Sequence, residues 1–214
     1  MITKDITIYH QNFTLHPSGV VYWQETDMLL IADVHLGKVM HFRKHGSAVP
    51  KAAMYHNFKN LDQVIQHFNP SVICFLGDLF HSYVNSEWVL FEEWVKQQQQ
   101  EIILVTGNHD VIDPNRYDQL GIHCTDEWQI GSILLTHHPE QRKNTFTISG
   151  HIHPGIQLRG LGKQSLSVPC FHIKPNQMVL PAFGAFTGKY IIIPQEEDDV
   201  FAIADNEVIP VTLD

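Results

Sequence analysis

The chain has 214 residues, 43% of them apolar and 17% charged, and this length is enough to bury a large core. Such a balance excludes a disordered protein. A formal net charge of −9 excludes a generally basic surface that would coat nucleic acid. It does not exclude an enzyme that acts on DNA, because local charge and bound cations can differ in sign from the total.

Three further features indicate where the protein works. No apolar run reaches the roughly 18 to 20 residues of a membrane span, and the first residues lack the basic and apolar blocks of a secretory signal. Cys74, Cys124 and Cys170 are scattered and odd in number, which argues against a disulfide framework. We therefore expect a cytoplasmic protein without a membrane segment, folded as a single domain over residues 1–214.

The first half of the chain predicts strands that alternate with helices. Residues 6–23 alternate apolar and polar side chains, as the short strands of a meander do. The expected apolar strands, and the two helices between them, cover residues 28–32, 51–68, 72–76, 86–97 and 102–105. Pro50 suits the first turn of the first helix, and Ser86 is expected to cap the second.

The second half predicts strands alone, at residues 133–136, 146–148, 166–173, 178–183, 190–193, 200–204 and 208–213. Asp205 and Asn206 suit a hairpin turn between the last two. Strand–helix alternation followed by strands predicts an α/β fold with more than one sheet. A four-layer α-β-β-α sandwich fits this order, and so does a single mixed sheet with a β extension.

Five polar clusters each follow directly on an expected apolar strand. They are Asp33-Val34-His35, Gly77-Asp78-Leu79-Phe80-His81, Gly107-Asn108-His109-Asp110, His137-His138 and Gly150-His151-Ile152-His153. Ligands of open α/β sheets bind beyond the carboxyl ends of the strands, so neighbouring strands would bring these clusters around one crevice. One cluster alone is usually a polar strand end, but five in the same position indicate a common site.

The donors in the clusters are carboxylate, imidazole and amide oxygen, without thiolate. This mixture suits Mn²⁺, Fe or Zn²⁺, and the histidines argue against Mg²⁺ and Ca²⁺. Asp33 and His35, like His151 and His153, would present alternate side chains of an extended segment to one ion. The ligands are too many for one ion, and a carboxylate such as Asp78 can bridge two cations about 3.5 to 4 Å apart, as in two-metal hydrolysis.

Three positions keep a simpler interpretation. His138, beside His137, can be a surface residue, and Asp110 can cap a helix instead of serving as a catalytic partner. Residues 181–188 are expected to form tight β structure, and the sequence assigns them no role.

In order and spacing, the clusters resemble the motifs of the calcineurin-like metallophosphoesterase superfamily: Asp-x-His, Gly-Asp-x-x-His, Gly-Asn-His-Asp, a strand-end His and Gly-His-x-His. The histidine at position 81 resembles the motif of the nuclease branches, because many phosphatases have aspartate at this position. Residues 30–38 and 180–188 further resemble the bacterial ligase-associated DNA-damage-response endonucleases. The resemblance implies a metal-dependent hydrolase of ester bonds with the four-layer α-β-β-α sandwich and two mixed sheets.

The superfamily pattern also implies the ligands of two divalent ions, with Mn²⁺ expected before Fe or Zn²⁺. One ion would be held by Asp33, His35, Asp78 and His153, and the other by Asp78, Asn108, His137 and His151. His137 is preferred to His138 because it lies nearer the strand end. His109 would protonate the leaving oxygen, with Asp110 orienting its ring, while the ions activate a water and neutralise phosphoryl oxygens.

His81, Lys38 and Arg43 are the expected substrate-binding residues. The basic loops at 38–45 and 159–163 either grip a nucleic-acid phosphate or are simply solvated. The resemblance and His81 favour a DNA-cleaving phosphodiesterase that works in repair beside ligase, helicase or exonuclease proteins.

Two other functions stay open at this stage. The acidic charge favours a phosphomonoesterase or a phosphodiesterase for small molecules such as cyclic nucleotides. A metal-bound scaffold without turnover is a third hypothesis. The presence of His109 and a full ligand set argues against the scaffold.

Overall fold

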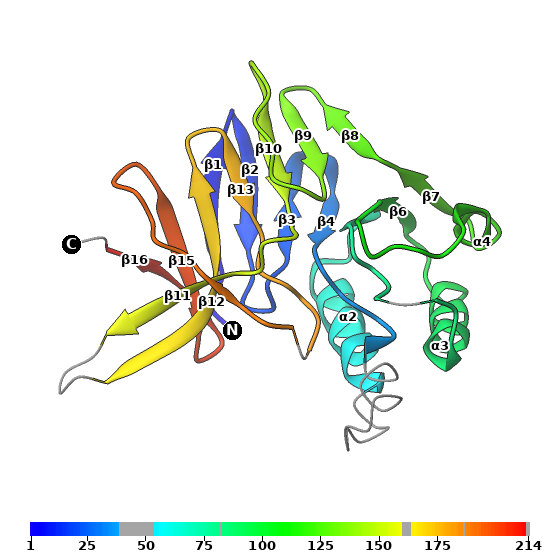
Figure 1. Ribbon diagram of the computed structural model, residues 1–214. Helices are drawn as coiled ribbons and strands as arrows, with labels where there is room; N and C mark the ends of the chain where they lie inside the picture. The colour runs from blue at the N-terminus through cyan, green and yellow to red at the C-terminus, as the bar shows by residue number, and fades with distance from the viewer. Residues whose placement is uncertain (39–53, 82, 160–163, 186, 213–214) are drawn as a thin grey trace.

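The computed structural model describes residues 1–38, 54–81, 83–159, 164–185 and 187–212, which form two mixed β-sheets with α-helices beside the first (Figure 1). The first sheet has the strand order β1-β2-β3-β4-β5-β6-β7, antiparallel up to β4 and parallel after it. Its strands are β1 (Lys4–Ile8), β2 (Gln11–Leu15), β3 (Val21–Trp23), β4 (Met28–Ile31), β5 (Val72–Leu76), β6 (Glu101–Val105) and β7 (Ile122–Thr125). The helical elements among them are η1 (Gln24–Thr26), α2 (Met54–Phe68), α3 (Ser86–Val95) and α4 (Pro114–Asp118).

The chain passes into the second sheet where β7 is followed by β8 (Figure 1). This sheet has the order β14-β11-β12-β13-β10-β9-β8, with β15 paired to β12 and β16 to β15. Strands β9, β10 and β13 are parallel to one another. The bounds are β8 (Glu127–Ile130), β9 (Ile133–Thr136), β10 (Phe146–Ser149), β11 (Pro154–Arg159), β12 (Ser165–Lys174), β13 (Gln177–Val179), β14 (Tyr190–Ile191), β15 (Asp199–Ala204) and β16 (Glu207–Val211).

Strands β4, β5 and β6 of the first sheet are buried on both faces, which explains their continuous apolar runs. In β4, Leu29 and Ile31 join the cluster formed with Phe58 and Leu61 of α2. Leu30 lies in a separate cluster with the side chains of β9 and β10. Helices, first sheet and second sheet therefore form three successive layers, and the polar strand ends lie at their common edge. No described helix is long and apolar enough to cross a membrane.

The structure confirms the two mixed sheets and excludes the single-sheet alternative. The described α-helices all lie between residues 54 and 118, before the second sheet. On the other face of that sheet, a third apolar cluster is formed by strand residues such as Ile156 and Val168. The described residues contain no α-helix after residue 118, and the predicted α/β fold with two mixed sheets is confirmed.

Several element boundaries differ from the prediction. Asn85, not Ser86, caps α3: its side chain accepts a hydrogen bond from the Glu87 amide, and the helix ends at Val95. Four elements, β7, β8, β11 and α4, were not predicted, because they are short and interrupted by polar residues, glycine or proline. The expected strands at 178–183 and 190–193 shorten to β13 and β14. Residues 50–53 lie outside the described ranges.

His16, at the end of β2, makes the stability of the fold depend on pH. Burial, and next the charge of His67, lower the pKa of His16 from 6.5 to about 4. Its Nδ1 accepts a hydrogen bond from the Ser18 amide (3.1 Å), and its buried Nε2 has no hydrogen-bond partner in the part of the chain that the structure describes. The unfolded chain therefore binds this proton more tightly, so stability is complete above pH 6.5 and falls towards pH 4, by about 3 kcal/mol.

His16→Asn is expected to reduce this loss of stability, because the amide oxygen still accepts from Ser18 but cannot be protonated. Urea unfolding of both proteins above pH 6.5 and near pH 4 measures the difference. An equal pH dependence in the two proteins would contradict the assignment to His16.

Candidate metal centre

The five polar clusters meet at one place in the structure. Asp33 and Asp78 follow β4 and β5 by two residues, and Asn108 follows β6 by three. In the second sheet, His137 follows β9 directly and His151 follows β10 by two residues. The strand ends of both sheets therefore contribute, as the sequence predicts.

The first ligand set lies between Asp33 and His35 of one sheet and His153 of the other. Nε2 of His153 lies 3.2 Å from Oδ1 of Asp33 and 3.3 Å from Nε2 of His35. Nε2 of His35 lies 4.0 Å from Oδ2 of Asp78. The Asp33 and His35 side chains are buried, while His153 is partly exposed, so the set opens to solvent on one side.

The second ligand set converges on Nε2 of His137. This atom lies 3.1 Å from Oδ1 of Asn108, 3.1 Å from Nδ1 of His151 and 3.3 Å from Oδ1 of Asp78. Nδ1 of His137 lies 3.0 Å from the Leu76 carbonyl, which can only accept a hydrogen bond. In the neutral ring Nδ1 therefore carries the proton, and Nε2 presents a lone pair to an ion.

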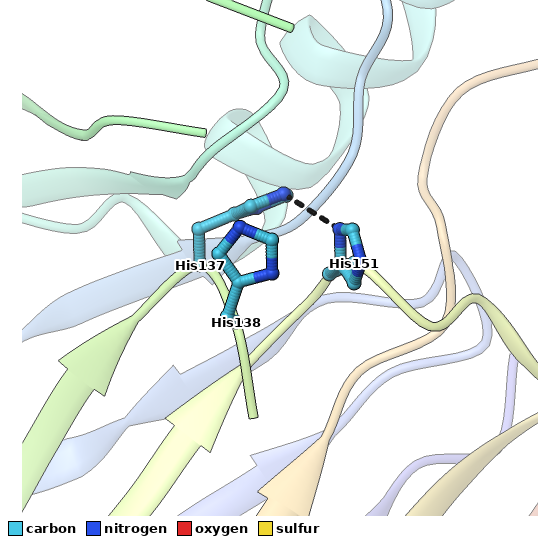
Figure 2. Close-up of side chains that lie close together, drawn as sticks. All are labelled: His137, His138 and His151. Carbon is cyan, nitrogen blue, oxygen red and sulfur yellow. Dashed lines mark hydrogen bonds between the residues drawn. The ribbon is translucent and has the colours of Figure 1, made fainter. Parts of the chain in front are cut away.

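His138 belongs to the same group of side chains. Figure 2 shows its ring beside those of His137 and His151, and the ring centroids of His138 and His151 lie 4.1 Å apart. Ring nitrogens of all three residues lie within 4.8 Å of one another. His138 is exposed, as its simpler interpretation requires, but it is also close enough to contribute to binding.

These residues fit a pair of divalent cations. Oδ1 of Asp33 is buried, and no described residue donates a hydrogen bond to it, so it lacks the partner that a buried carboxylate oxygen needs. Burial, then the charge of Lys38, lowers the pKa of His35 to about 2, and burial also lowers the pKa of His151. The imidazoles of His35 and His151 are therefore neutral at neutral pH and can bind metal.

The backbone at the ligands differs from the extended segments that the sequence suggested. Five ligands have positive φ angles: Asp33 (55°), His35 (51°), Asp78 (52°), His151 (69°) and His153 (53°). The left-handed region costs a non-glycine residue about 1 to 3 kcal/mol and persists only where the surroundings hold it. Here the Asp33 amide donates to the Gly77 carbonyl (3.2 Å) and the His35 amide to the Asp78 carbonyl (2.9 Å).

Each aspartate also binds the backbone of another cluster. Oδ2 of Asp33 accepts from the His151 amide (2.9 Å), and Oδ1 of Asp78 accepts from the His109 amide (2.9 Å). Two glycines leave room for these contacts. A Cβ on Gly107 would lie 2.3 Å from Oδ1 of Asp78, and one on Gly150 would lie 2.5 Å from Oδ2 of Asp33. The glycines of the motifs thus allow the backbone to approach the carboxylates closely.

His109 is exposed beside both ligand sets. Its ring centroid lies 4.7 Å from that of His81 and 6.0 Å from that of His35. The Asp110 carboxylate accepts from the Phe80 and Gly107 amides (3.0 and 2.8 Å), and burial raises its pKa to about 6.

Asp110 therefore ties the loops after β5 and β6 together. In the described residues it makes no hydrogen bond to the His109 ring. The alternative in which Asp110 caps a helix is wrong, because Asp113 caps α4.

The segment 183–185 supports the loop that carries Asp33 and His35, a role that the sequence did not suggest. The Phe183 and Gly184 amides donate to the carbonyls of Ala32 (2.9 Å) and Asp33 (3.1 Å). Any Cβ on Gly184 would lie 2.2 Å from the Val34 carbonyl oxygen, so glycine is needed there.

Asn57 of α2 connects this loop to the same segment. Its amide nitrogen donates to the Val34 carbonyl, and its Oδ1 accepts from the Ala185 amide, both at 3.1 Å. The side chain is 7% exposed. A polar residue on the apolar face of the predicted helix was the signal that could have found it.

Asn57→Ala is expected to destabilise the protein by about 2 to 4 kcal/mol, because two buried backbone groups lose their partners. Mn²⁺ should also bind less tightly, since the loop carrying Asp33 and His35 is less firmly held. Urea unfolding and calorimetric Mn²⁺ titration measure both effects. Asn60→Ala, one turn later on α2 where the side chain contacts His56, is the control. Equal affinities in the two variants would contradict the supporting role.

The expected substrate-binding residues differ in position. Lys38 is half-buried; burial lowers the pKa of its ammonium group, while the charges of Asp33 and Asp78 raise it. Arg43 lies outside the described residues. Arg159 ends β11, about 17 Å along the strand from the site. A cavity of about 520 Å³ beside Arg159 contains none of the candidate ligands.

The sequence and the fold are similar to those of known proteins. Residues 27–180 match the calcineurin-like phosphoesterase family. The nuclease MPE of Pseudomonas putida is 28% identical, with 98% of this chain and 100% of that chain covered and a TM-score of 0.84. The phosphoesterase Yfce of E. coli is 16% identical over 86% of this chain and 97% of its own, with a TM-score of 0.44. No curated protein matches the sequence.

The fold and the clustered aspartate and histidine side chains define a metal-dependent hydrolase of phosphate esters. The family match covers well over half of the sequence. The chain therefore belongs to the calcineurin-like phosphoesterase family.

Proposed function

We propose that the protein is a binuclear phosphodiesterase that cleaves DNA, with Mn²⁺ as its preferred ion. The observation that carries the proposal is the position of Asp78 between the two ligand sets. Its Oδ2 lies 4.0 Å from the His35 imidazole and its Oδ1 lies 3.3 Å from the His137 imidazole. One carboxylate with an oxygen towards each set is what a shared ligand of two cations requires.

Seven residues would hold the ions in this proposal: Asp33, His35, Asp78, Asn108, His137, His151 and His153. The ions supply Lewis acidity, which eases deprotonation of a water and offsets the charge of phosphoryl oxygens. Mn²⁺ is preferred because the donors combine imidazole nitrogen with carboxylate and amide oxygen, and Fe or Zn²⁺ would also suit them.

The remaining side chains bind the substrate and move a proton. His109 is exposed beside both ligand sets and protonates the departing oxygen, while the Asp78–His109 hydrogen bond fixes its backbone. Lys38 contributes a cation for a phosphoryl oxygen, and His81, with its ring against those of His35 and His109, contacts the substrate. Asp110 contributes indirectly, because it holds the loops after β5 and β6 together.

The similarity to a bacterial nuclease over almost the whole chain supports a nucleic acid as the substrate and one domain over residues 1–214. The three cysteines are free, which supports work in a reducing cytoplasm. We further propose that the protein works in DNA repair together with ligase, helicase or exonuclease proteins. This role follows from the sequence resemblance alone.

A parallel assay with Mn²⁺ tests the substrate class. It compares a phosphomonoester, a small phosphodiester, and single- and double-stranded DNA. Cleavage of the diester and of DNA without cleavage of the monoester is the expected result. Monoester cleavage alone would support the phosphomonoesterase, which the net charge of −9 favours. Bound metal with no cleavage of any substrate would support the scaffold.

A further inference from the structure

Beside the metal centre lies a cavity of about 340 Å³ that the second sheet forms. Its wall is continuous with the ligands. Ile152, which lies between His151 and His153 in the chain, lines the cavity. Tyr190, which also lines it, donates its backbone amide to the His153 carbonyl (2.9 Å). The cavity therefore adjoins the segment that carries His151 and His153.

The walls of the cavity are apolar and open to solvent. Tyr190 is 66% exposed and Ile193 is 85% exposed, although side chains of this size are usually covered in a folded protein. Pro139 and Ile152 complete the wall on the side of the metal centre. Such exposed apolar groups next to a reactive site indicate contact with a flat, weakly polar part of a ligand.

Polar groups line the same cavity. Nε2 of the His172 ring is paired with Oδ2 of Asp198 at 2.8 Å, and both residues are buried. The carboxylate can only accept, so in the neutral ring Nδ1 is left as an acceptor. Lys174 adds a cation and Gln177 an amide with both donor and acceptor atoms. An apolar wall with several hydrogen-bonding groups suits a ring with apolar faces and polar edges.

We propose that this cavity is a subsite for a nucleobase of the substrate, formed by Tyr190, Ile152 and Ile193, with His172 and Gln177 at the base edge. The proposal rests on the phosphodiesterase function proposed above, which it deepens. A volume of about 340 Å³ lies within the range of roughly 300 to 1,000 Å³ of small-molecule sites. Exposed aromatic side chains bind bases by stacking, whatever the base.

The position of the cavity assigns this base to the part of the substrate that keeps the phosphate. His109, on the side of the departing oxygen, follows β6 of the first sheet, whereas β12, β13 and β14 of the second sheet line the cavity. The leaving group and the cavity thus lie on different sides of the ligands. A base can enter only when it is unstacked from its neighbours.

Two chromogenic diesters test the subsite without DNA. Thymidine 5′-(p-nitrophenyl phosphate) and methyl p-nitrophenyl phosphate release the same p-nitrophenolate and differ only in the nucleoside. The kcat/KM ratio of the thymidine ester to the methyl ester should be about 10 or more, as expected for stacking of one base. Thymidine 3′-(p-nitrophenyl phosphate), assayed in parallel, tests a substrate in which the 3′ oxygen of the nucleoside carries the phosphate.

Tyr190→Ala and Ile193→Ser are expected to lower this ratio to near one. Val89→Ser is the matched control, because Val89 is an exposed apolar residue of α3 outside the cavity, and it should keep the wild-type ratio. Cleavage of neither ester by the wild type would overturn the proposed phosphodiesterase function itself.

Cleavage of both esters with a ratio near one for each isomer, or with a ratio that Tyr190→Ala leaves unchanged, would overturn the subsite alone. Light scattering tests the other occupant, a second copy of the chain. A dimer that Ile193→Ser separates without altering the ratio would assign the cavity to an interface.

Discussion

Asp78→Ala is expected to lose most bound metal and to lower kcat/KM on a phosphodiester by on the order of 10³-fold or more, since several kcal/mol of charge stabilisation disappear. Asp78 has one oxygen towards each ligand set, so its removal affects both ions. Removal of any other ligand would leave one of the two sets with all its members.

Metal content after dialysis against Mn²⁺ measures the first effect, and diester hydrolysis measures the second. Asp118→Ala removes an exposed carboxylate from α4 and should match the wild type in both. Asp78→Asn keeps an acceptor for the His109 amide, so it separates loss of charge from loss of that hydrogen bond. If Asp78→Ala still bound two ions per chain, Asp78 could not be the shared ligand.

The position of the site could be predicted from the sequence because it depends on local patterns. Buried parallel strands need apolar side chains on both faces, so β4, β5 and β6 appear as continuous apolar runs. Polar residues directly after such runs must lie at the carboxyl edge of the sheet. This pattern alone, without the family resemblance, predicts the positions of Asp33, Asp78 and Asn108.

The backbone of the site could not be predicted in this way. Asp33, His35 and His153 have positive φ angles, which no residue type except glycine favours. Hydrogen bonds from residues distant in the sequence hold this conformation, such as the bond between the Gly184 amide and the Asp33 carbonyl. A sequence pattern records the residue types but not these tertiary contacts.

The supporting contacts were missed for the same reason. Asn57 and Ala185 are 128 positions apart, and no periodicity relates them. The sequence locates His138 but does not show what it contacts. His138 lies one position farther from the end of β9 than His137, and only its packing against His151 shows that this exposed residue also lies near the ligands.

His109→Ala is expected to keep its metal and lose turnover, by about 10² to 10⁴-fold on DNA, the usual contribution of a general acid. The reason is its position: the His109 ring is exposed, and its hydrogen bond to the ligands is made by the backbone amide, which donates to Oδ1 of Asp78. Alanine preserves that amide, so the Asp78 carboxylate keeps its hydrogen bond and the ligand sets keep their geometry.

The dependence on the leaving group distinguishes proton transfer from a structural effect. p-Nitrophenolate departs without a proton, whereas the alkoxide of a DNA strand needs one. His109→Ala should therefore lose far more activity on DNA than on a p-nitrophenyl diester, while Mn²⁺ content stays at the wild-type level. His123→Ala, an exposed histidine of β7, controls for removal of an imidazole. Equal losses on both substrates would show that His109 does not deliver the proton to the leaving oxygen.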